Sequence, residues 1–260
     1  MRTNRVAVSA VSSWGWTFDE DLRFWDRARI DHVGLSLRKC DRVGLGRAVE
    51  RVRAAGLRVA NFVECGADPA RWRAAAEALG ALGGGALVLT TGPGRPLDWD
   101  GSIAALGERL ARVLDPAVPG VTVAIENTGP LRVDLSFVTT LRDTVDAADA
   151  LGCGVCAELN SCWAERSLDA TLARARARLA HVQISDWKVG SLCTPDRCVP
   201  GDGDIPLARL VRAVEATGYR GAYEIEMIGP RIENEGYAPA ITRAVEYVEA
   251  LVGSSVDPSP

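Results

Sequence analysis

Four polar side chains stand at the ends of four otherwise apolar segments, and their types suit a hard metal ion. They are Glu126 in VTVAIEN, Glu158 in CGVCAELN, Gln183 in AHVQISD and Glu226 in GAYEIEM. A buried parallel strand normally reads as a continuous apolar run, and a carboxylate inside one is costly unless something neutralises its charge. Three carboxylates and one amide oxygen, brought to one point, are ligands that Mg2+, Mn2+ or Ca2+ prefers.

The elements that would position these residues alternate along the chain between strand and helix patterns. One-sided apolar stripes at helical spacing separate the strand-like segments, as at Leu168, Leu172 and Ala175. Such alternation predicts a parallel sheet with right-handed crossovers, and the number of units in this length predicts a single (β/α)8 TIM barrel. The predicted strands are 5–12, 31–38, 57–64, 86–91, 121–127, 154–159, 180–185 and 222–228.

A doubly wound open sheet is the alternative α/β fold. It would usually carry a glycine-rich phosphate-binding turn after the first strand, but residues 12–16 read Ser-Ser-Trp-Gly-Trp, with two tryptophans and one glycine. The segment 17–20, Thr-Phe-Asp-Glu, predicts a capping box at the start of the first helix. We expect residues 1–252 to form the barrel and the segment 253–260, GSSVDPSP, to be a flexible tail.

Composition and charge exclude several classes of function. The 260 residues carry a net charge of −4 with no basic cluster, which argues against nucleic-acid binding. No apolar run approaches the roughly 18 residues of a membrane span, and the N-terminal segment lacks the features of a signal peptide. We therefore expect a cytoplasmic protein that acts on a small molecule, without nucleic-acid or membrane partners.

Seven cysteines are present, and their odd number argues against a disulfide framework. The pair Cys153 and Cys156 has the spacing of a redox or zinc motif, but Cys156 falls inside a strand pattern and no second pair accompanies it. A structural role is the better interpretation of this pair. Cys193 and Cys198 flank a predicted loop and are either a stabilising pair or free thiols.

Several segments resemble the xylose isomerase-like barrels, the sugar phosphate isomerase and epimerase group that includes tagatose epimerases and inosose dehydratases. The resemblance covers roughly residues 5–250, and the loop PGDGDIPL followed by GYRG-x4-E is its most specific part. The segments that carry it are AIEN (124–127), AELN (157–160), HVQISD (181–186), RCVPGDGDIPL (197–207) and GYRGAYEIEMIGPRI (218–232).

The resemblance implies one divalent ion, Mn2+ or Mg2+, held by Glu126, Glu158, Gln183 and Glu226. It also implies that Glu126 and Glu226 are the catalytic carboxylates, which remove and return a proton next to a carbonyl through a metal-stabilised enediolate. Two departures from the family pattern bear on this site. Glu158 stands where the family usually has Asp, and Gln183 where it often has His, so metal preference or affinity could differ.

Two further polar residues in the same strands leave alternatives open. His181 lies two residues before Gln183 and so shares its face of the strand; it is either a substitute ligand or part of a deeper layer, and we prefer the deeper layer. Glu224 alternates with Glu226 in the same way. We favour Glu226 as the site residue because it follows Gly221 in the G-x4-E pattern.

Residues near the ends of other strands are candidates for substrate binding. Arg197 precedes the Pro200–Gly203 turn and could bind a carboxylate or phosphate through its planar fork, and Lys188 could hold an anionic group. Asn127 and Glu64 could bond a substrate hydroxyl. Tryptophan faces suit sugars or aromatic rings, and four tryptophans follow predicted strands: Trp14, Trp16, Trp163 and Trp187.

The leading hypothesis is a divalent-metal-dependent isomerase or epimerase acting on a sugar, polyol or related hydroxy-carbonyl compound. A metal-dependent dehydratase or lyase, and a metal-free barrel that only binds a ligand, are the alternatives, because a barrel fold alone does not fix a reaction. Multi-zinc endonuclease barrels are excluded, since two histidines cannot build their clusters. Similar proteins lead us to expect a homodimer or homotetramer.

Overall fold

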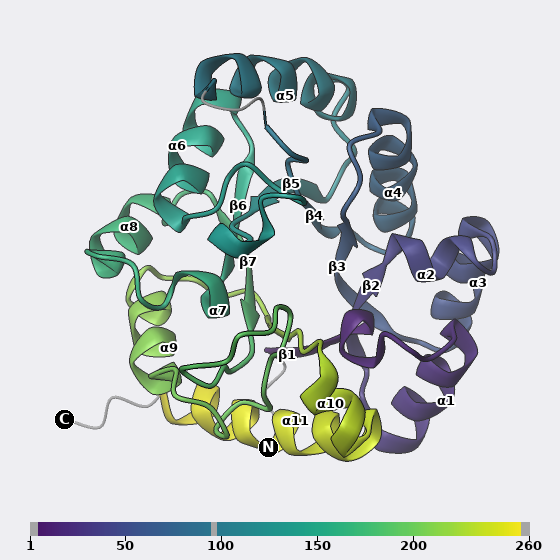
Figure 1. Cartoon of the computed structure of the whole chain (residues 1–260). Helices are drawn as coiled ribbons and strands as arrows, with labels where there is room; N and C mark the ends of the chain where they lie inside the picture. The colour runs from purple at the N-terminus through teal and green to yellow at the C-terminus, as the bar shows by residue number, and fades with distance from the viewer. Residues whose placement is uncertain (1–4, 95–97, 256–260) are drawn as a thin grey trace.

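The computed structural model describes residues 5–94 and 98–255, and these residues confirm the predicted barrel. Eight strands close into one parallel sheet in the order β1 to β8, with helices around it (Figure 1). The strands are β1 (Val6–Ser9), β2 (His32–Ser36), β3 (Arg58–Glu64), β4 (Gly85–Leu89), β5 (Val121–Glu126), β6 (Gly154–Glu158), β7 (Leu179–Ile184) and β8 (Tyr223–Ile225).

Helices follow the strands as the apolar stripes predict. The capping box of α1 is present, with Thr17 and Glu20 bonded reciprocally. The helical elements are η1 (Ala10–Ser13), α1 (Phe18–Ala28), α2 (Leu37–Asp41), α3 (Leu45–Ala54), α4 (Pro69–Ala81), α5 (Trp99–Leu114), η2 (Pro130–Arg132), α6 (Leu141–Leu151), α7 (Leu159–Cys162), α8 (Leu168–Ala175), α9 (Leu207–Ala216), α10 (Pro230–Glu235) and α11 (Tyr237–Ser255).

Three details differ from the sequence-based expectations. The first strand ends at Ser9 because a 3-10 turn, η1, follows it, and β8 ends one residue before Glu226. The last helix, α11, continues to Ser255, so residues 253–255 are helical rather than part of a tail. Residues 256–260 lie outside the described ranges. All seven cysteines are free, so Cys193 and Cys198 are not paired.

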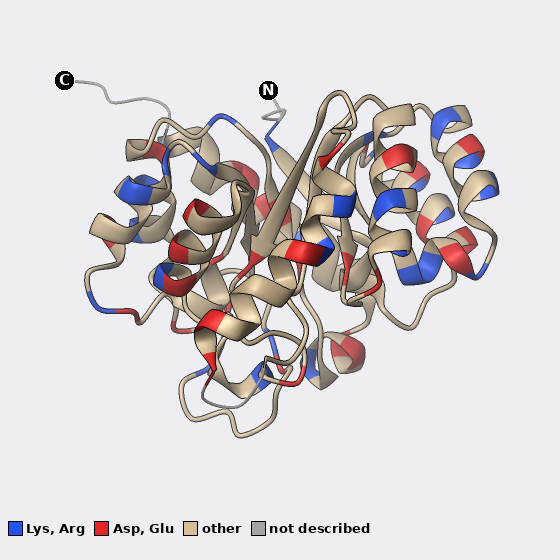
Figure 2. Cartoon of the chain, turned by 90° about the horizontal axis from the view of Figure 1, so that it is seen from above, with Lys and Arg blue, Asp and Glu red and all other residues tan. Residues whose placement is uncertain are grey.

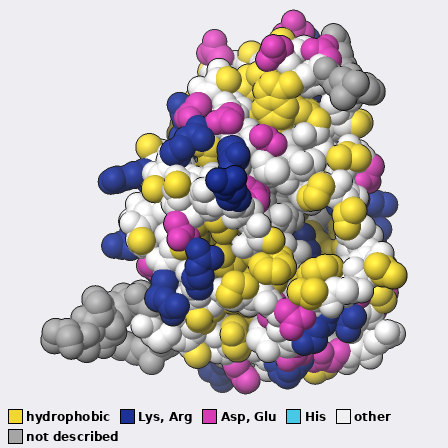
Figure 3. Space-filling view, turned by 60° about the vertical axis from the view of Figure 1, so that its left-hand side comes forward, with side chains coloured by type: hydrophobic (Ala, Val, Ile, Leu, Met, Phe, Trp, Pro, Cys, Tyr) yellow, Lys and Arg dark blue, Asp and Glu magenta, His cyan; other side chains and the backbone are white. Residues whose placement is uncertain are grey.

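Side chains of both charges lie on the surface of the described residues (Figure 2 and Figure 3). Lys and Arg alternate with Asp and Glu along the helices (Figure 2), and both signs of charge appear among apolar side chains on the face in Figure 3. Within the described ranges, no helix combines the length and the apolar character that crossing a bilayer requires.

The barrel interior has an apolar part and a polar part. The apolar cluster comes mainly from β3 to β6 and includes Val63, Val88 and Ala124, with Trp14 and Ile228 packed against it. The buried polar residues of β5 to β8 include Glu126 and Gln183. Because alternate residues of a strand point to the same face, each strand contributes successive layers to this interior.

A buried ion pair fixes the turn that carries Trp14 after β1. Lys39 of α2 is 2% exposed and its Nζ donates to the carbonyls of Ala10 (3.1 Å) and Ser13 (3.0 Å). The same Nζ forms an ion pair with Asp21 of α1, which also accepts a 2.6 Å hydrogen bond from the Ser13 hydroxyl. This network ties α1, α2 and η1 together beneath the carboxyl end of the barrel.

Removing only one partner of this pair should destabilise the protein strongly. Lys39→Met leaves the Asp21 carboxylate buried without its cation, which costs about 3–5 kcal/mol in the free energy of unfolding. Urea denaturation measures the loss. The double variant Asp21→Asn/Lys39→Met should recover most of the stability, because no unpaired charge remains; equal losses in both variants would contradict this role.

Candidate active site

The four residues at the strand ends do converge at the carboxyl end of the barrel. Glu126 ends β5 and Glu158 ends β6, Gln183 lies in β7, and Glu226 directly follows β8. Gln183 is paired in register with Glu158 on one side and Glu224 on the other. All four side chains are nearly inaccessible to solvent, with Glu226 the most exposed at 7%.

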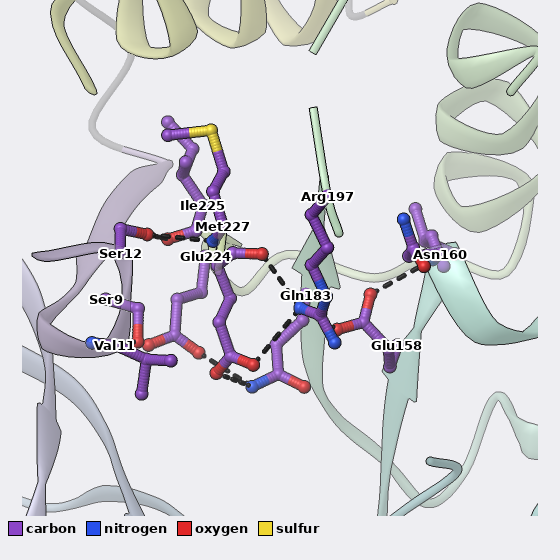
Figure 4. Close-up of polar contacts among 12 residues, drawn as sticks. Ser9, Val11, Ser12, Glu158, Asn160, Gln183, Arg197, Glu224, Ile225 and Met227 are labelled. Carbon is purple, nitrogen blue, oxygen red and sulfur yellow. Dashed lines mark hydrogen bonds and ion pairs between the residues drawn. The ribbon is translucent and has the colours of Figure 1, made fainter. Parts of the chain in front are cut away.

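Arg197 reaches into this group, with its guanidinium beside Glu158 in Figure 4 and within ion-pair distance of Glu226 as well. Its Nη1 is 2.7 Å from Glu158 Oε2 and 3.1 Å from Glu226 Oε1, and it donates to the Glu226 backbone carbonyl at 2.8 Å. Arg197 is therefore part of the carboxylate cluster itself, in direct contact with Glu158 and Glu226.

The loop that follows Arg197 is wound around one carboxylate, that of Asp186. The two oxygens of Asp186 accept backbone N–H groups from Gly201 (2.9 Å), Gly203 (3.0 Å) and Ile205 (3.0 Å). A Cβ at residue 203 would lie 2.0 Å from Asp186 Oδ1, so this position requires glycine. The motifs HVQISD and PGDGDIPL therefore form one structural unit.

The same unit fixes the backbone of Arg197. Cys198 exchanges two backbone hydrogen bonds with Asp186, at 2.7 and 3.2 Å. The Arg197 N–H donates to the Ile228 carbonyl at 3.0 Å. The guanidinium is therefore held from the β7 side and from the β8 side at once.

Gln183 presents its amide nitrogen, and not its carbonyl, to the cluster. Nε2 donates to Glu226 Oε2 at 2.8 Å and to Glu224 Oε2 at 3.2 Å, whereas Oε1 accepts from the Cys156 thiol at 3.3 Å. The metal-ligand interpretation of Gln183 assumed the opposite orientation, with the carbonyl turned toward Glu226.

His181 and Glu224 form a deeper layer, which was the preferred interpretation of His181. His181 Nε2 lies 2.9 Å from Glu224 Oε2, and the Asn61 amide donates to the same oxygen at 3.0 Å. His181 also lines a cavity of about 390 Å3 at the amino ends of the strands, away from Glu226. His181 is thus a support beneath the site, in contact with Glu224.

Burial and mutual repulsion shift the ionisation of the cluster. Burial and the charge of Glu158 raise the pKa of Glu126 to about 8. Burial likewise raises the pKa of Glu158 and Glu226. Burial alone would lower the pKa of Arg197, but the charges of Glu158 and Glu226 outweigh it and raise this pKa, so the guanidinium stays charged. Full ionisation of the three carboxyl groups beside one guanidinium would leave a net charge of −2, and the raised pKa values reflect the cost of that charge in a buried site.

Glu126 differs from the other carboxylates because no described residue donates a hydrogen bond to it or pairs with it. Both oxygens of Glu226 and both of Glu158 have partners within 3.1 Å, among them the Asn160 N–H. The Arg197 and Arg132 charges act on Glu126 only at longer range. A carboxylate that is buried and unpaired is costly, and it fits a site that receives a cation or a substrate proton.

The residues fit a divalent cation in chemistry and in charge. In their present side-chain positions, no three or more His, Cys, Asp or Glu residues of the described ranges are grouped as metal ligands, and the Arg197 guanidinium lies among the acids. Carboxylate oxygens are nevertheless the ligands of hard cations, and a divalent cation would favour the ionised form of the three carboxyls and balance the charge of −2 that they and Arg197 would then carry. Glu126, Glu158 and Glu226 are the residues that would hold it.

Three other predicted residues are occupied elsewhere. Both amide atoms of Asn127 bond the backbone of Glu158, at 2.9 and 3.0 Å, so Asn127 joins β5 to β6 and is not available to a substrate hydroxyl. Lys188 is exposed and lies 3.4 Å from Asp204. Glu64 pairs with Arg71 at 3.2 Å.

Only one of the four tryptophans belongs to the barrel interior. Trp14 packs against the inner apolar cluster, with the Arg38 guanidinium 5.2 Å from its ring centre. Trp16 packs edge-on against Phe24 and Tyr237. Trp163 and Trp187 also pack against the outer core between sheet and helices. The expected wall of four tryptophans is therefore reduced to Trp14.

Cys65 and Arg132 are site neighbours that the sequence analysis did not select. Cys65 directly follows β3, and desolvation together with the negative charges of Glu126 and Glu226 raises the pKa of its thiol to about 12. Because Cys65 directly follows a predicted strand, the sequence alone could have identified it as a candidate site residue. The charge of Arg132, in η2 shortly after β5, acts on both Glu126 and Cys65.

Loss of the Asp186 carboxylate should release the loop that carries Arg197. Asp186→Ala removes the acceptor of several charge-assisted hydrogen bonds, each worth about 1.5–3 kcal/mol, so we expect a loss of at least about 3 kcal/mol in urea denaturation and faster proteolysis within 189–204. Asp26→Ala is the control, because Asp26 is an exposed aspartate on α1, outside this loop. Equal behaviour of the two variants would contradict the role of Asp186.

The comparisons with known proteins agree with this architecture. No curated relative matches the chain. The structure of protein SMc04130 from Sinorhizobium meliloti 1021 is 27% identical, with a TM-score of 0.84 over 95% of this chain and 98% of that one. A D-psicose 3-epimerase from Clostridium cellulolyticum H10, solved with D-tagatose, is 16% identical, with a TM-score of 0.73 over 95% and 99%.

An IolI protein with a bound zinc atom is 17% identical, with a TM-score of 0.77 over 96% of this chain and 98% of that one. At such identities the likeness to the epimerase and to IolI shows the fold alone. The model of the xylose isomerase-like TIM barrel family matches residues 64–250, which is most of the chain and includes all four strand-end residues. The chain belongs to the xylose isomerase-like TIM barrel family.

Proposed function

We propose that the protein is a divalent-metal-dependent isomerase or epimerase of a sugar, polyol or related hydroxy-carbonyl compound. The observation that carries this proposal is the contrast between two buried carboxylates. Glu126 has no partner among the described residues, whereas both oxygens of Glu226 are held. One acid is thus free to accept a proton while the other is fixed in place.

Glu126, Glu158 and Glu226 are the residues that would hold the cation, as their oxygen donors and net charge suggest. A bound divalent ion would supply polarisation of a substrate carbonyl, which acidifies the neighbouring C–H. Mn2+ and Mg2+ are the ions that an all-carboxylate site favours. In our proposal, Arg197 turns part of its guanidinium toward substrate oxygens that enter the site.

Proton transfer is assigned to Glu126 and Glu226. They stand on β5 and at the end of β8, with β6 and β7 between them, so a substrate between the two acids meets one on each side. Glu126 removes the proton, and Glu226 returns one. Return to the opposite face of the same carbon gives epimerisation, and return to the neighbouring carbon gives isomerisation.

Two further observations support a sugar-like substrate. Trp14 and Ile228 pack against the apolar cluster of the barrel interior, and such a wall suits the apolar face of a sugar ring or chain. Structural neighbours include the D-psicose 3-epimerase solved with D-tagatose and an L-ribulose 3-epimerase, and their reactions are of the proposed kind.

The test is deuterium incorporation from D2O into candidate ketoses, aldoses and inososes, followed by proton NMR with Mn2+ or Mg2+ present. Turnover should require Glu126, and Glu126→Gln should lose about 1000-fold in rate, since general base catalysis contributes about 100- to 10,000-fold. Glu108→Gln on the exposed surface of α5 is the matched control and should keep full rate. Undiminished exchange in Glu126→Gln would refute the assignment.

A further inference from the structure

The amide of Gln183 lies between two groups that accept hydrogen bonds. Its Nε2 donates to Glu224 Oε2 at 3.2 Å and to Glu226 Oε2 at 2.8 Å. Glu224 Oε2 also accepts from the Asn61 amide at 3.0 Å, so a carbonyl placed there would face an oxygen that already serves as an acceptor. The Gln183 carbonyl instead receives the Cys156 thiol at 3.3 Å. Every neighbour of this amide therefore favours the same orientation.

Glu224 is the residue that enforces this orientation, because it cannot turn away. It is fully buried, and its Oε2 also meets His181 Nε2 at 2.9 Å and the Asn61 amide at 3.0 Å. A Cβ at Gly34 would lie only 1.7 Å from Glu224 Oε1, so the carboxylate fills the space that Gly34 leaves. Figure 4 shows the Glu224 side chain beside Gln183.

We infer that Gln183 is a positioning residue for Glu226 and not a fourth ligand of the cation. Its N–H fixes Glu226 Oε2 from the β7 side, while Arg197 holds Oε1 at 3.1 Å. The layer of Glu224, His181 and Asn61 keeps Gln183 in its donor orientation. The inference rests on the proposed function, since it assigns the cation to three carboxylates alone: Glu126, Glu158 and Glu226.

The first test needs neither metal nor substrate. In nitrogen-15 NMR spectra of the full chain, the side-chain NH2 of Gln183 is identified by its loss in Gln183→Met. We expect this NH2 to exchange with water at least about 10-fold more slowly than exposed glutamine amides, because both hydrogens are bonded to buried carboxylates. We also expect it to shift in Glu226→Gln. Fast exchange, or no response to Glu226→Gln, would overturn the inference.

The second test separates a positioning role from a ligand role with Mn2+ itself. Titration of chelator-treated protein should show that Gln183→Met weakens Mn2+ binding by less than about 10-fold, while its turnover falls by about 10- to 100-fold at nearly constant KM. Glu126→Gln, which removes a ligand, should weaken Mn2+ binding by about 100-fold or more. A loss in Gln183→Met as large as in Glu126→Gln would assign Gln183 to the cation and overturn the inference.

The two tests distinguish failure of this inference from failure of the proposed function. If the wild-type protein bound no Mn2+, the proposed metal dependence would fail, and the NMR exchange rate alone would decide the role of Gln183. Thermal unfolding of Gln183→Met confirms that the variant is folded. If Gln183→Met does not fold, Gln183→Leu replaces it. The exchange rate of the Gln183 NH2 in the wild-type protein still decides its role, because that measurement needs no active variant.

Discussion

The burial of three carboxyl groups around one guanidinium at the carboxyl end of the barrel is the constraint on which the rest of the site depends. Glu126, Glu158 and Glu226 are nearly inaccessible to solvent, and Arg197 supplies one positive charge among them. Burying unbalanced charge is expensive, so such an arrangement persists only where function requires it. A divalent cation would balance the charge, and this requirement is the physical basis of the proposed activity.

The surrounding structure serves to hold these charges in place. The Asp186 carboxylate gathers the backbone of the loop after β7, and this loop delivers Arg197 to Glu158 and Glu226. Beneath the cluster, Glu224 holds Gln183 with its N–H toward Glu226. Both supports, Asp186 and Glu224, are side chains outside the proposed set of cation ligands. Sites whose geometry must be exact commonly depend on such outer partners.

Sequence reasoning predicted the fold well because the barrel depends on patterns that a single chain displays. Strand and helix periodicity, a capping box and turn glycines are all local signals, and charged residues in apolar runs marked the strand-end acids. Side-chain direction was not predictable. Whether Gln183 offers oxygen or nitrogen depends on Glu224 and Cys156, and the use of Asn127 depends on the backbone of Glu158. The positions of the tryptophans were not predictable for the same reason. A tryptophan that follows a strand can pack in the barrel interior or in the outer core between sheet and helices.

The most direct test of the central claim is a Mn2+ titration of chelator-treated protein, monitored by the electron paramagnetic resonance signal of free Mn2+. We predict one site per chain, weakened by about 100-fold or more in Glu126→Gln and in Glu226→Gln. These variants keep the shape of the side chain and remove one negative charge. Absence of a site, or a site that is unchanged in both variants, would contradict the claim that these carboxylates are built around a cation.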